Sequence, residues 1–178
     1  GQLDPNLRSV VYSLASYDGN REVYRRVREL YMEAEMQEEK TRLLSAMASF
    51  KQKDILRDAL EFSLSKDVRS MHAIIPIARV SNNHFAGDMA GDFFKENWKE
   101  FKKRYAESKH MMIYLIKFTT SGFKSMEKAE EVGSFFSKNP VPNAKMAIKQ
   151  SLEKIRINYN FMSKNKGEIE DWLKENHG

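Results

Sequence analysis

The sequence predicts an all-α fold. Apolar residues recur every three or four positions along almost the whole chain of 178 residues, which is the period of an amphipathic helix. No segment alternates apolar and polar residues over the length of a strand, and the Asp18-Gly19 pair joins two helical stripes rather than two β-branched segments. Glycine, proline and capping residues separate the stripes at short intervals, so about ten helices are expected.

Four helices are expected between residues 5 and 65. Asp4-Pro5 predicts a helix start, because aspartate caps an N-terminus and proline fits the first helical position. Asp18-Gly19-Asn20 ends that helix and can cap the next one, and the fourth helix ends near Ser65. The four apolar stripes are Leu7, Val10, Val11 and Leu14; Val23, Val27, Leu30, Tyr31 and Ala34; Leu43, Leu44, Met47 and Phe50; and Ile55, Leu56, Ala59, Leu60 and Phe62.

The middle of the chain continues the helical pattern. A helix is expected to start near Asp67, and Pro76 inside it predicts a kink or an early end. The following stripes are Phe85, Met89 and Phe93; Trp98, Phe101 and Tyr105; and the strongly apolar run from Met111 to Phe118.

The last third is divided by two breaks. Gly122 ends a helix, Ser125 caps the next, and Asn139-Pro140-Val141-Pro142 is the clearest loop. Lys166-Gly167 predicts an interruption before a last short helix. The long stripe before it is Ile148, Leu152, Ile155, Tyr159 and Met162, and the short one after it is Ile169, Trp172 and Leu173.

Short connections make neighbouring helices antiparallel. Helix pairs in units of about 35–45 residues predict a HEAT- or armadillo-like α-solenoid that forms one helical-repeat domain over residues 1–178. A compact helical bundle is the alternative fold.

Composition narrows the classes of function. No run approaches the length of a membrane span, no signal peptide is visible, and the chain has neither cysteine nor an Asn-x-Ser/Thr sequence, all of which favour a cytoplasmic protein. The net charge of +5 arises from interspersed charges, which indicates a mixed solvated surface. Residues 95–110 mix lysines with Trp98, Phe101 and Tyr105, but these aromatics share one helical face, so burial explains them better than nucleic-acid binding.

No catalytic or metal-binding motif is present. The four histidines form no H-E-x-x-H pair, and no phosphate-binding glycine loop or G-x-S-x-G sequence occurs. We interpret His72 and His84 as plain polar residues, and we expect no catalytic residue, metal ligand or cofactor in this chain.

A series of short motifs resembles a known family. They are Asp4-Pro5-x-Leu7-Arg8-x-x-Val11-Tyr12, Glu38-Glu39-Lys40-x-x-Leu43-Leu44-x-Ala46-Met47-Ala48-Ser49, Leu60-Glu61-Phe62-x-Leu64-Ser65, Val68-Arg69, Phe93-Phe94-x-x-Asn97-Trp98, Thr120-x-x-Phe123, Glu130-Glu131-Val132-x-x-Phe135-Phe136, Ile155-Arg156-x-Asn158 and Trp172-Leu173. In this order they resemble the C-terminal helical domain of the gluzincin aminopeptidases, the group with puromycin-sensitive aminopeptidase and the tricorn-interacting factors.

The resemblance implies a parent enzyme that removes N-terminal residues from peptides with a bound zinc. The zinc motif of the family lies in an upstream catalytic domain, so the resemblance implies that this chain is a non-catalytic part that packs on that domain and encloses the peptide cavity. The alternative is a stand-alone helical-repeat module that binds a protein or a nucleic acid.

The resemblance also suggests residues that face the cavity. The segment from Thr119 through Thr120, Gly122 and Phe123 matches a family loop that looks inward, although an ordinary helix–helix turn is the simpler interpretation. Arg69 and Arg156 are candidates for bidentate pairing with a peptide carboxylate, and pairing with nearby glutamates is the alternative that we favour. Ser49 stands where some members carry a basic residue, which is a departure from the family pattern.

Overall fold

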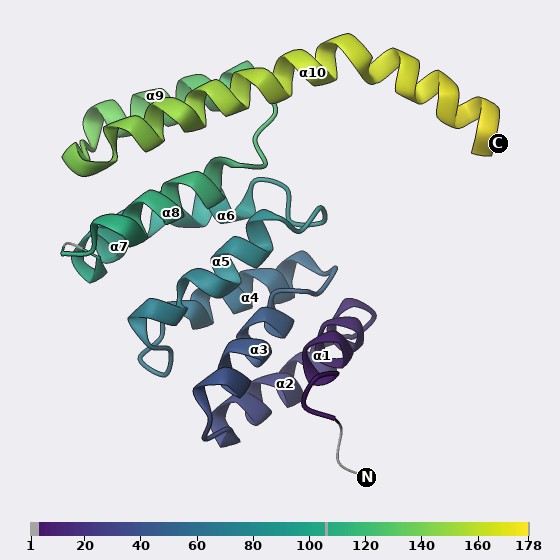
Figure 1. Cartoon of the computed structure of the whole chain (residues 1–178), viewed down its shortest axis with the longest axis vertical. Coiled ribbons are helices and arrows are strands. Elements are labelled where there is room, and N and C mark those ends of the chain that lie inside the picture. The colour runs from purple at the N-terminus through teal and green to yellow at the C-terminus, as the bar shows by residue number, and fades with distance from the viewer. Residues whose placement is uncertain (1–3, 106, 178) are drawn as a thin grey trace.

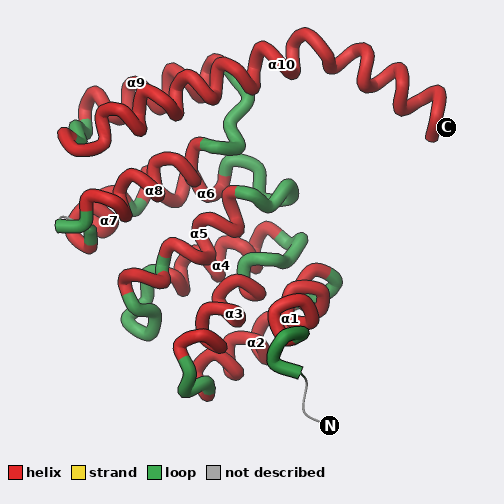
Figure 2. The backbone as a smooth tube through the Cα atoms, in the orientation of Figure 1, coloured by secondary structure: helices red, strands yellow, loops and turns green. Residues whose placement is uncertain are grey.

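A computed structural model describes residues 4–105 and 107–177, and within these ranges the chain is helical without a strand (Figures 1 and 2). The all-α prediction is therefore confirmed. Ten α-helices and two short 3-10 helices occupy the described residues. They are α1 (Arg8–Tyr17), α2 (Arg21–Glu33), α3 (Gln37–Met47), α4 (Lys53–Ser63), η1 (Ser70–His72), α5 (Ile74–Ser81), α6 (Met89–Glu96), α7 (Trp98–Arg104), α8 (Lys109–Thr120), α9 (Met126–Lys138), η2 (Pro142–Ala144) and α10 (Lys145–His177).

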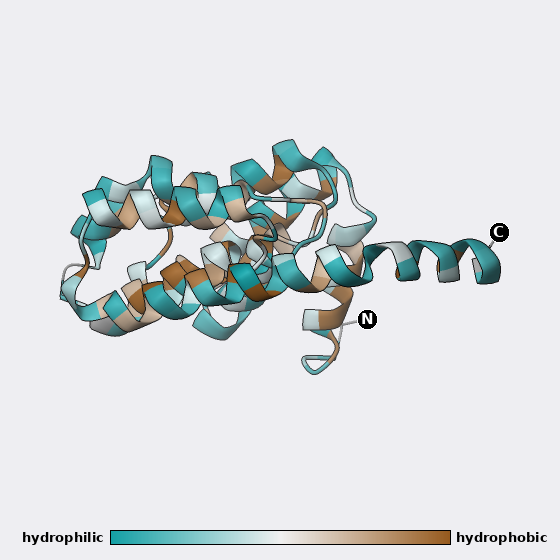
Figure 3. Ribbon diagram, turned by 90° about the horizontal axis from the view of Figure 1, so that it is seen from above, coloured by the Kyte–Doolittle hydropathy of each residue, from teal (hydrophilic) through white to brown (hydrophobic). Residues whose placement is uncertain are grey.

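The helices form two layers. Helices α1, α3, α5, α8 and α10 lie side by side in one layer, and α2, α4, α6 and α9 form the other. Successive first-layer helices begin about 35 residues after one another, except that the interval between α1 and α3 is shorter. Each repeating unit is therefore one antiparallel helix pair. Successive units stack in one direction, and the C-terminal part of α10 extends past the rest of the molecule (Figure 3). Whether the repeat belongs to the HEAT or the armadillo class stays a prediction.

One apolar core runs through the stack between the layers. Its side chains come from nearly every helix, and the largest of those under 2% exposed include Tyr31, Phe50, Phe93, Phe101 and Leu115. Around α6, α7 and α9 the core is aromatic, since Trp98 lies edge-on to Phe94 at 5.5 Å and to Phe135 at 5.4 Å between ring centres. Such edge contacts add to the free energy gained by burial.

Polar contacts join neighbouring units at one end of the helix pairs. The buried Tyr31 hydroxyl donates to the Asp67 carbonyl at 3.0 Å, and the Tyr105 hydroxyl donates to the Ser70 carbonyl at 2.5 Å. Each bond therefore links one unit to the connection of a neighbouring unit about 35 residues away.

Ion pairs link the second-layer helices in the same way. Arg21 of α2 pairs with Asp58 of α4, Arg57 of α4 pairs with Glu96 of α6 at 2.7 Å, and Lys95 of α6 pairs with Glu131 of α9. These partners are 36 to 39 residues apart in the sequence, so the ion pairs repeat with the helix units.

Two predicted helix starts are wrong. Helix α1 begins at Arg8, because residues 5–7 form a turn in which the Asp4 carboxylate accepts from the Asn6 N–H at 2.8 Å. Helix α5 begins at Ile74 rather than near Asp67. Pro76 therefore lies in its first turn, where a missing N–H breaks no helical hydrogen bond, and it causes neither a kink nor an early end.

The predicted interruption at Lys166-Gly167 is also wrong, because α10 runs from Lys145 to His177 without a break. A glycine inside a helix costs only about 1 kcal/mol relative to alanine. Ending the helix there would cost more, because the backbone N–H and C=O groups at two new helix ends would lose their hydrogen bonds. The predicted caps at Asn20 and Ser125 are confirmed, since both side chains accept backbone N–H bonds at helix starts. In the part of the chain that the structure describes, no helix combines the length and the apolar character needed to cross a bilayer.

Candidate functional site

A groove runs along the edge of the stack where the first-layer helices end. It is lined by the C-terminal part of α1 and by the ends of α3, α5 and α8 with the connections that follow them, which the repeat brings into one row. Two adjoining cavities of about 560 and 500 Å³ form the groove, and both are lined by Asn82, Asn83 and His84 of the α5–α6 connection. We call the two cavities together the connection groove.

Asn83 fixes the shape of the connection groove. Its side-chain amide donates to the Phe50 carbonyl at 2.8 Å and to the Ala48 carbonyl at 3.4 Å, and its side-chain oxygen accepts from the Phe85 N–H at 3.0 Å. One side chain thereby ties the α3–α4 connection to the α5–α6 connection and holds the turn that follows.

The same type of bond recurs in other units. The Gln52 amide donates to the Gly19 carbonyl at 3.0 Å, and the Asn158 amide donates to the Phe123 carbonyl at 3.0 Å. Connection carbonyls along this edge therefore receive a side-chain amide from a neighbouring unit.

Replacing Asn83 with alanine is expected to lower the free energy of unfolding by about 1–3 kcal/mol, because buried carbonyls lose their donor. Urea unfolding monitored by circular dichroism measures this change. The matched control is Asn82→Ala, whose exposed amide bonds only to the Ala78 carbonyl of its own helix and whose loss is expected to change stability by less than about 0.5 kcal/mol. Equal effects of the two substitutions would contradict the role assigned to Asn83.

The connection groove contains cations of two kinds. Lys128 is neutralised by Glu131 at 2.9 Å and by Asp88 and Asp92 at 3.5 Å each. Burial lowers the pKa of Lys128, but the hydrogen bond with Glu131 and the surrounding carboxylates outweigh it and raise the pKa above its usual range. The charge of Lys128 is therefore used in ion pairs that join α6 and α9, and it is not available to a ligand.

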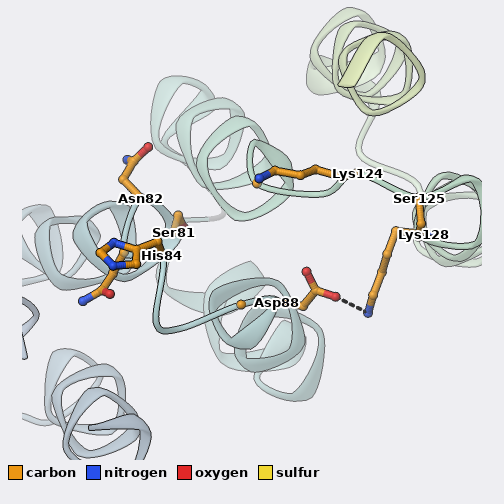
Figure 4. A pocket seen from close by; sticks show the side chains of 10 residues that line it. Ser81, Asn82, His84, Asp88, Lys124, Ser125 and Lys128 are labelled. Carbon is orange, nitrogen blue, oxygen red and sulfur yellow. Dashed lines mark hydrogen bonds and ion pairs between the residues drawn. The ribbon is translucent and has the colours of Figure 1, made fainter. Parts of the chain in front are cut away.

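Lys124 and Arg79 are different. Lys124 extends from the α8–α9 connection across the groove (Figure 4) and has no ion pair among the described residues. Arg79 donates to the Ser49 hydroxyl at 3.1 Å and likewise has no carboxylate partner in the described chain. The groove therefore holds two cations that no carboxylate of the described residues neutralises.

Only one of the residues predicted to face a cavity lines the connection groove, namely Gly122. The Thr119 and Thr120 hydroxyls donate within α8 to the Leu115 and Ile116 carbonyls at 2.7 Å. Thr120 also lines a separate cavity of about 250 Å³ between α8 and α10. Phe123 is 3% exposed and packs in the core against Gly91.

The two predicted arginines lie elsewhere. Arg69 is exposed in the α4–α5 connection, which is at the opposite end of α5 from the groove, and Arg156 is exposed on α10. Neither has a carboxylate partner among the described residues, so the favoured pairing with nearby glutamates is not observed. Their contact with a substrate stays a prediction.

Sequence reasoning missed Arg79, Asn83 and Lys124. Each is unremarkable within its own connection, and the groove exists only because connections about 35 residues apart lie side by side. One signal in the sequence could have identified the groove. Gln52, Asn83 and Asn158 each follow a helix connection by 33 to 35 residues, which is the length of one repeating unit. His84, interpreted as a plain polar residue, lines both cavities.

Across residues 4–105 and 107–177, no group of three His, Asp or Glu side chains is placed to hold a metal ion. The observed features are a row of helix connections and two cations that have no ion pair among the described residues. They define a scaffold of helical hairpins with a groove along one edge.

This chain belongs to the ERAP1-like C-terminal domain family, whose model matches residues 1–157. Relatives include aminopeptidase M1-D of Oryza sativa subsp. japonica, which is 31% identical over 171 residues, and aminopeptidase M1 of Arabidopsis thaliana, which is 30% identical over 169 residues. Aminopeptidase N of Bos taurus is 28% identical over 177 residues. These alignments cover 94%, 93% and 97% of this chain but only 19%, 19% and 18% of the relatives, so the chain corresponds to about a fifth of their length.

Proposed function

We propose that this chain is a non-catalytic part of a larger aminopeptidase and forms a wall of its peptide cavity. The family match supports the proposal, because the matching family is a C-terminal domain. The alignments with the aminopeptidases also cover only about a fifth of the length of each relative. The observation that carries the role in binding is the connection groove, in which Arg79 and Lys124 have no ion pair within the part of the chain that the structure describes. A peptide carries a carboxylate at its far end, and such cations are suited to bind it.

Two labelled peptides test this role. They share one sequence and differ only in a free or an amidated C-terminus, and fluorescence anisotropy measures their binding to the 178-residue chain. The free carboxylate is expected to bind more tightly, and Lys124→Gln or Arg79→Gln is expected to reduce its affinity about threefold to tenfold. Binding of the amidated peptide should not change.

Arg69→Gln and Arg156→Gln are the matched controls, because both arginines are exposed and lie outside the connection groove. Equal affinity for the two peptides would show that the groove does not bind the peptide carboxylate. A loss of affinity in Arg69→Gln or Arg156→Gln alone would instead assign the contact to the arginines named from the sequence.

The same proposal gives the chain its partner, the catalytic domain of the same polypeptide. Exposed apolar side chains at the two ends of the stack support it, since Val10 and Leu14 of α1 are 56% and 61% exposed and Phe161 of α10 is 57% exposed. The chain should associate with a separately produced catalytic portion in sedimentation experiments, and Val10→Asp or Phe161→Asp should weaken that association. Absence of a complex at high concentration would refute this part.

The parent enzyme is proposed to be a zinc metallopeptidase of the cytoplasm. The described residues provide no ligand set for zinc, so the metal would be held by residues outside this chain. The cytoplasmic location rests on the absence of cysteine and of Asn-x-Ser/Thr sequences.

A further inference from the structure

A second, smaller cavity lies at the opposite ends of the first-layer helices from the connection groove. It is lined by the α7–α8 connection and by the loop that leads from α9 into α10, and its volume is about 200 Å³. Its walls are the largely buried side chains of Trp98, Tyr105 and Met112, together with Val141. We call it the tryptophan pocket.

The rim of the tryptophan pocket is rigid. Pro140 and Pro142 flank Val141, and each proline ring fixes one backbone dihedral. Trp98 is also held, because its ring packs edge-on against Phe94, Phe135 and Phe136. A pocket whose walls are fixed in this way loses little conformational freedom when a ligand binds.

The charge at the pocket comes from lysine. Trp98 contributes its ring to the wall, and among the described residues its indole N–H makes no hydrogen bond within the protein. Lys102 lines the pocket from the exposed face of α7, and it has no ion pair within the described ranges. The pocket lining includes no aspartate or glutamate, so its charge is positive.

We propose that the tryptophan pocket binds a small carboxylate with an apolar ring or chain. The apolar body fits against Trp98, Met112 and Val141, and the carboxylate stays at the mouth within reach of Lys102. At about 30 Å³ for each water-sized group, the cavity has room for about seven non-hydrogen atoms, which is the size of a phenyl ring or a short alkyl chain. The site is independent of the proposed peptide groove, because the two share no lining residue.

Nuclear magnetic resonance on the 178-residue chain tests the proposal with benzoate and hexanoate as probes. The chain has two tryptophans, Trp98 and Trp172, and Trp172 is 57% exposed on the distant end of α10. Both probes are expected to shift the Trp98 indole N–H resonance in a saturable manner and to leave that of Trp172 unchanged. The variant Trp172→Phe assigns the two resonances.

Two variants and two neutral probes separate this site from weak general binding. Lys102→Gln at an exposed position is expected to weaken the acids about two- to fivefold and to leave benzamide and hexanamide unaffected. Val141→Phe fills the pocket and should abolish binding of all four probes, with circular dichroism to confirm that the variant is folded. Unchanged Trp98 resonances at millimolar acid, equal binding of acids and amides, or binding that persists in folded Val141→Phe would each overturn the proposal.

Discussion

Replacing Phe101 with alanine is expected to lower the free energy of unfolding by about 3–5 kcal/mol. Phe101 is fully buried in α7, and its ring lies 5.3 Å from that of Phe94 and 6.0 Å from that of Phe93. The substitution removes this buried surface and leaves a cavity that the surrounding rings of Phe93, Phe94 and Tyr105 cannot fill by a small shift. Domains are typically stable by only about 5–15 kcal/mol, so much of the stability would be lost.

Urea unfolding measured by circular dichroism gives this value. Phe161→Ala is the control, because Phe161 is exposed on α10 and its removal creates no cavity in the core. The control is expected to change stability by less than about 0.5 kcal/mol. If both variants lost the same free energy, the aromatic cluster would not be the centre of the core.

Gly91→Ala is expected to destabilise the chain even though alanine favours helices. A Cβ atom at Gly91 in α6 would lie 2.4 Å from the Phe123 ring and 2.8 Å from the Thr119 carbonyl oxygen. The carbonyl belongs to the backbone of α8 and cannot move aside without shifting that helix. Overpacking costs about 1–3 kcal/mol, which exceeds the gain in helix propensity of about 1 kcal/mol.

Gly133→Ala supplies a matched test in α9. There the Cβ atom would meet only the Leu152 side chain at 4.0 Å, which is an ordinary contact. This substitution should raise the free energy of unfolding by about 0.5–1 kcal/mol. Thermal unfolding of the two alanine variants should therefore shift in opposite directions, and a rise for both would contradict the close approach of α6 to α8.

The sequence predicted the helices well because the period of the apolar residues depends only on local geometry. The stripe from Val23 to Ala34 and the caps at Asn20 and Ser125 required no knowledge of the fold. The errors have local causes as well. Pro76 looked like a kink because the start of α5 was placed too early, and Gly167 looked like a break because an exposed glycine has a small cost that a long helix tolerates.

The site was harder to predict than the fold. Gly122 lies in the connection after α8 and lines the connection groove, and its contact with a substrate stays a prediction. Its helical neighbours Thr119 and Thr120 were named with it, but their hydroxyls bond within α8. The sequence could not show that Arg79 and Lys124 line the same groove. They are 45 positions apart, and only the stacking of the units brings both to that groove.

The amide and hydroxyl bonds between units have a mechanical consequence. Those of Gln52, Asn83 and Asn158 reach back 33 to 35 positions, and that of Tyr31 reaches forward 36. Because each links neighbouring units only, a small rotation at one interface is not resisted by distant parts of the chain, and rotations add along the stack. The molecule is therefore expected to behave as an elastic spring, in which bending widens or narrows the row of connections while every helix keeps its own shape.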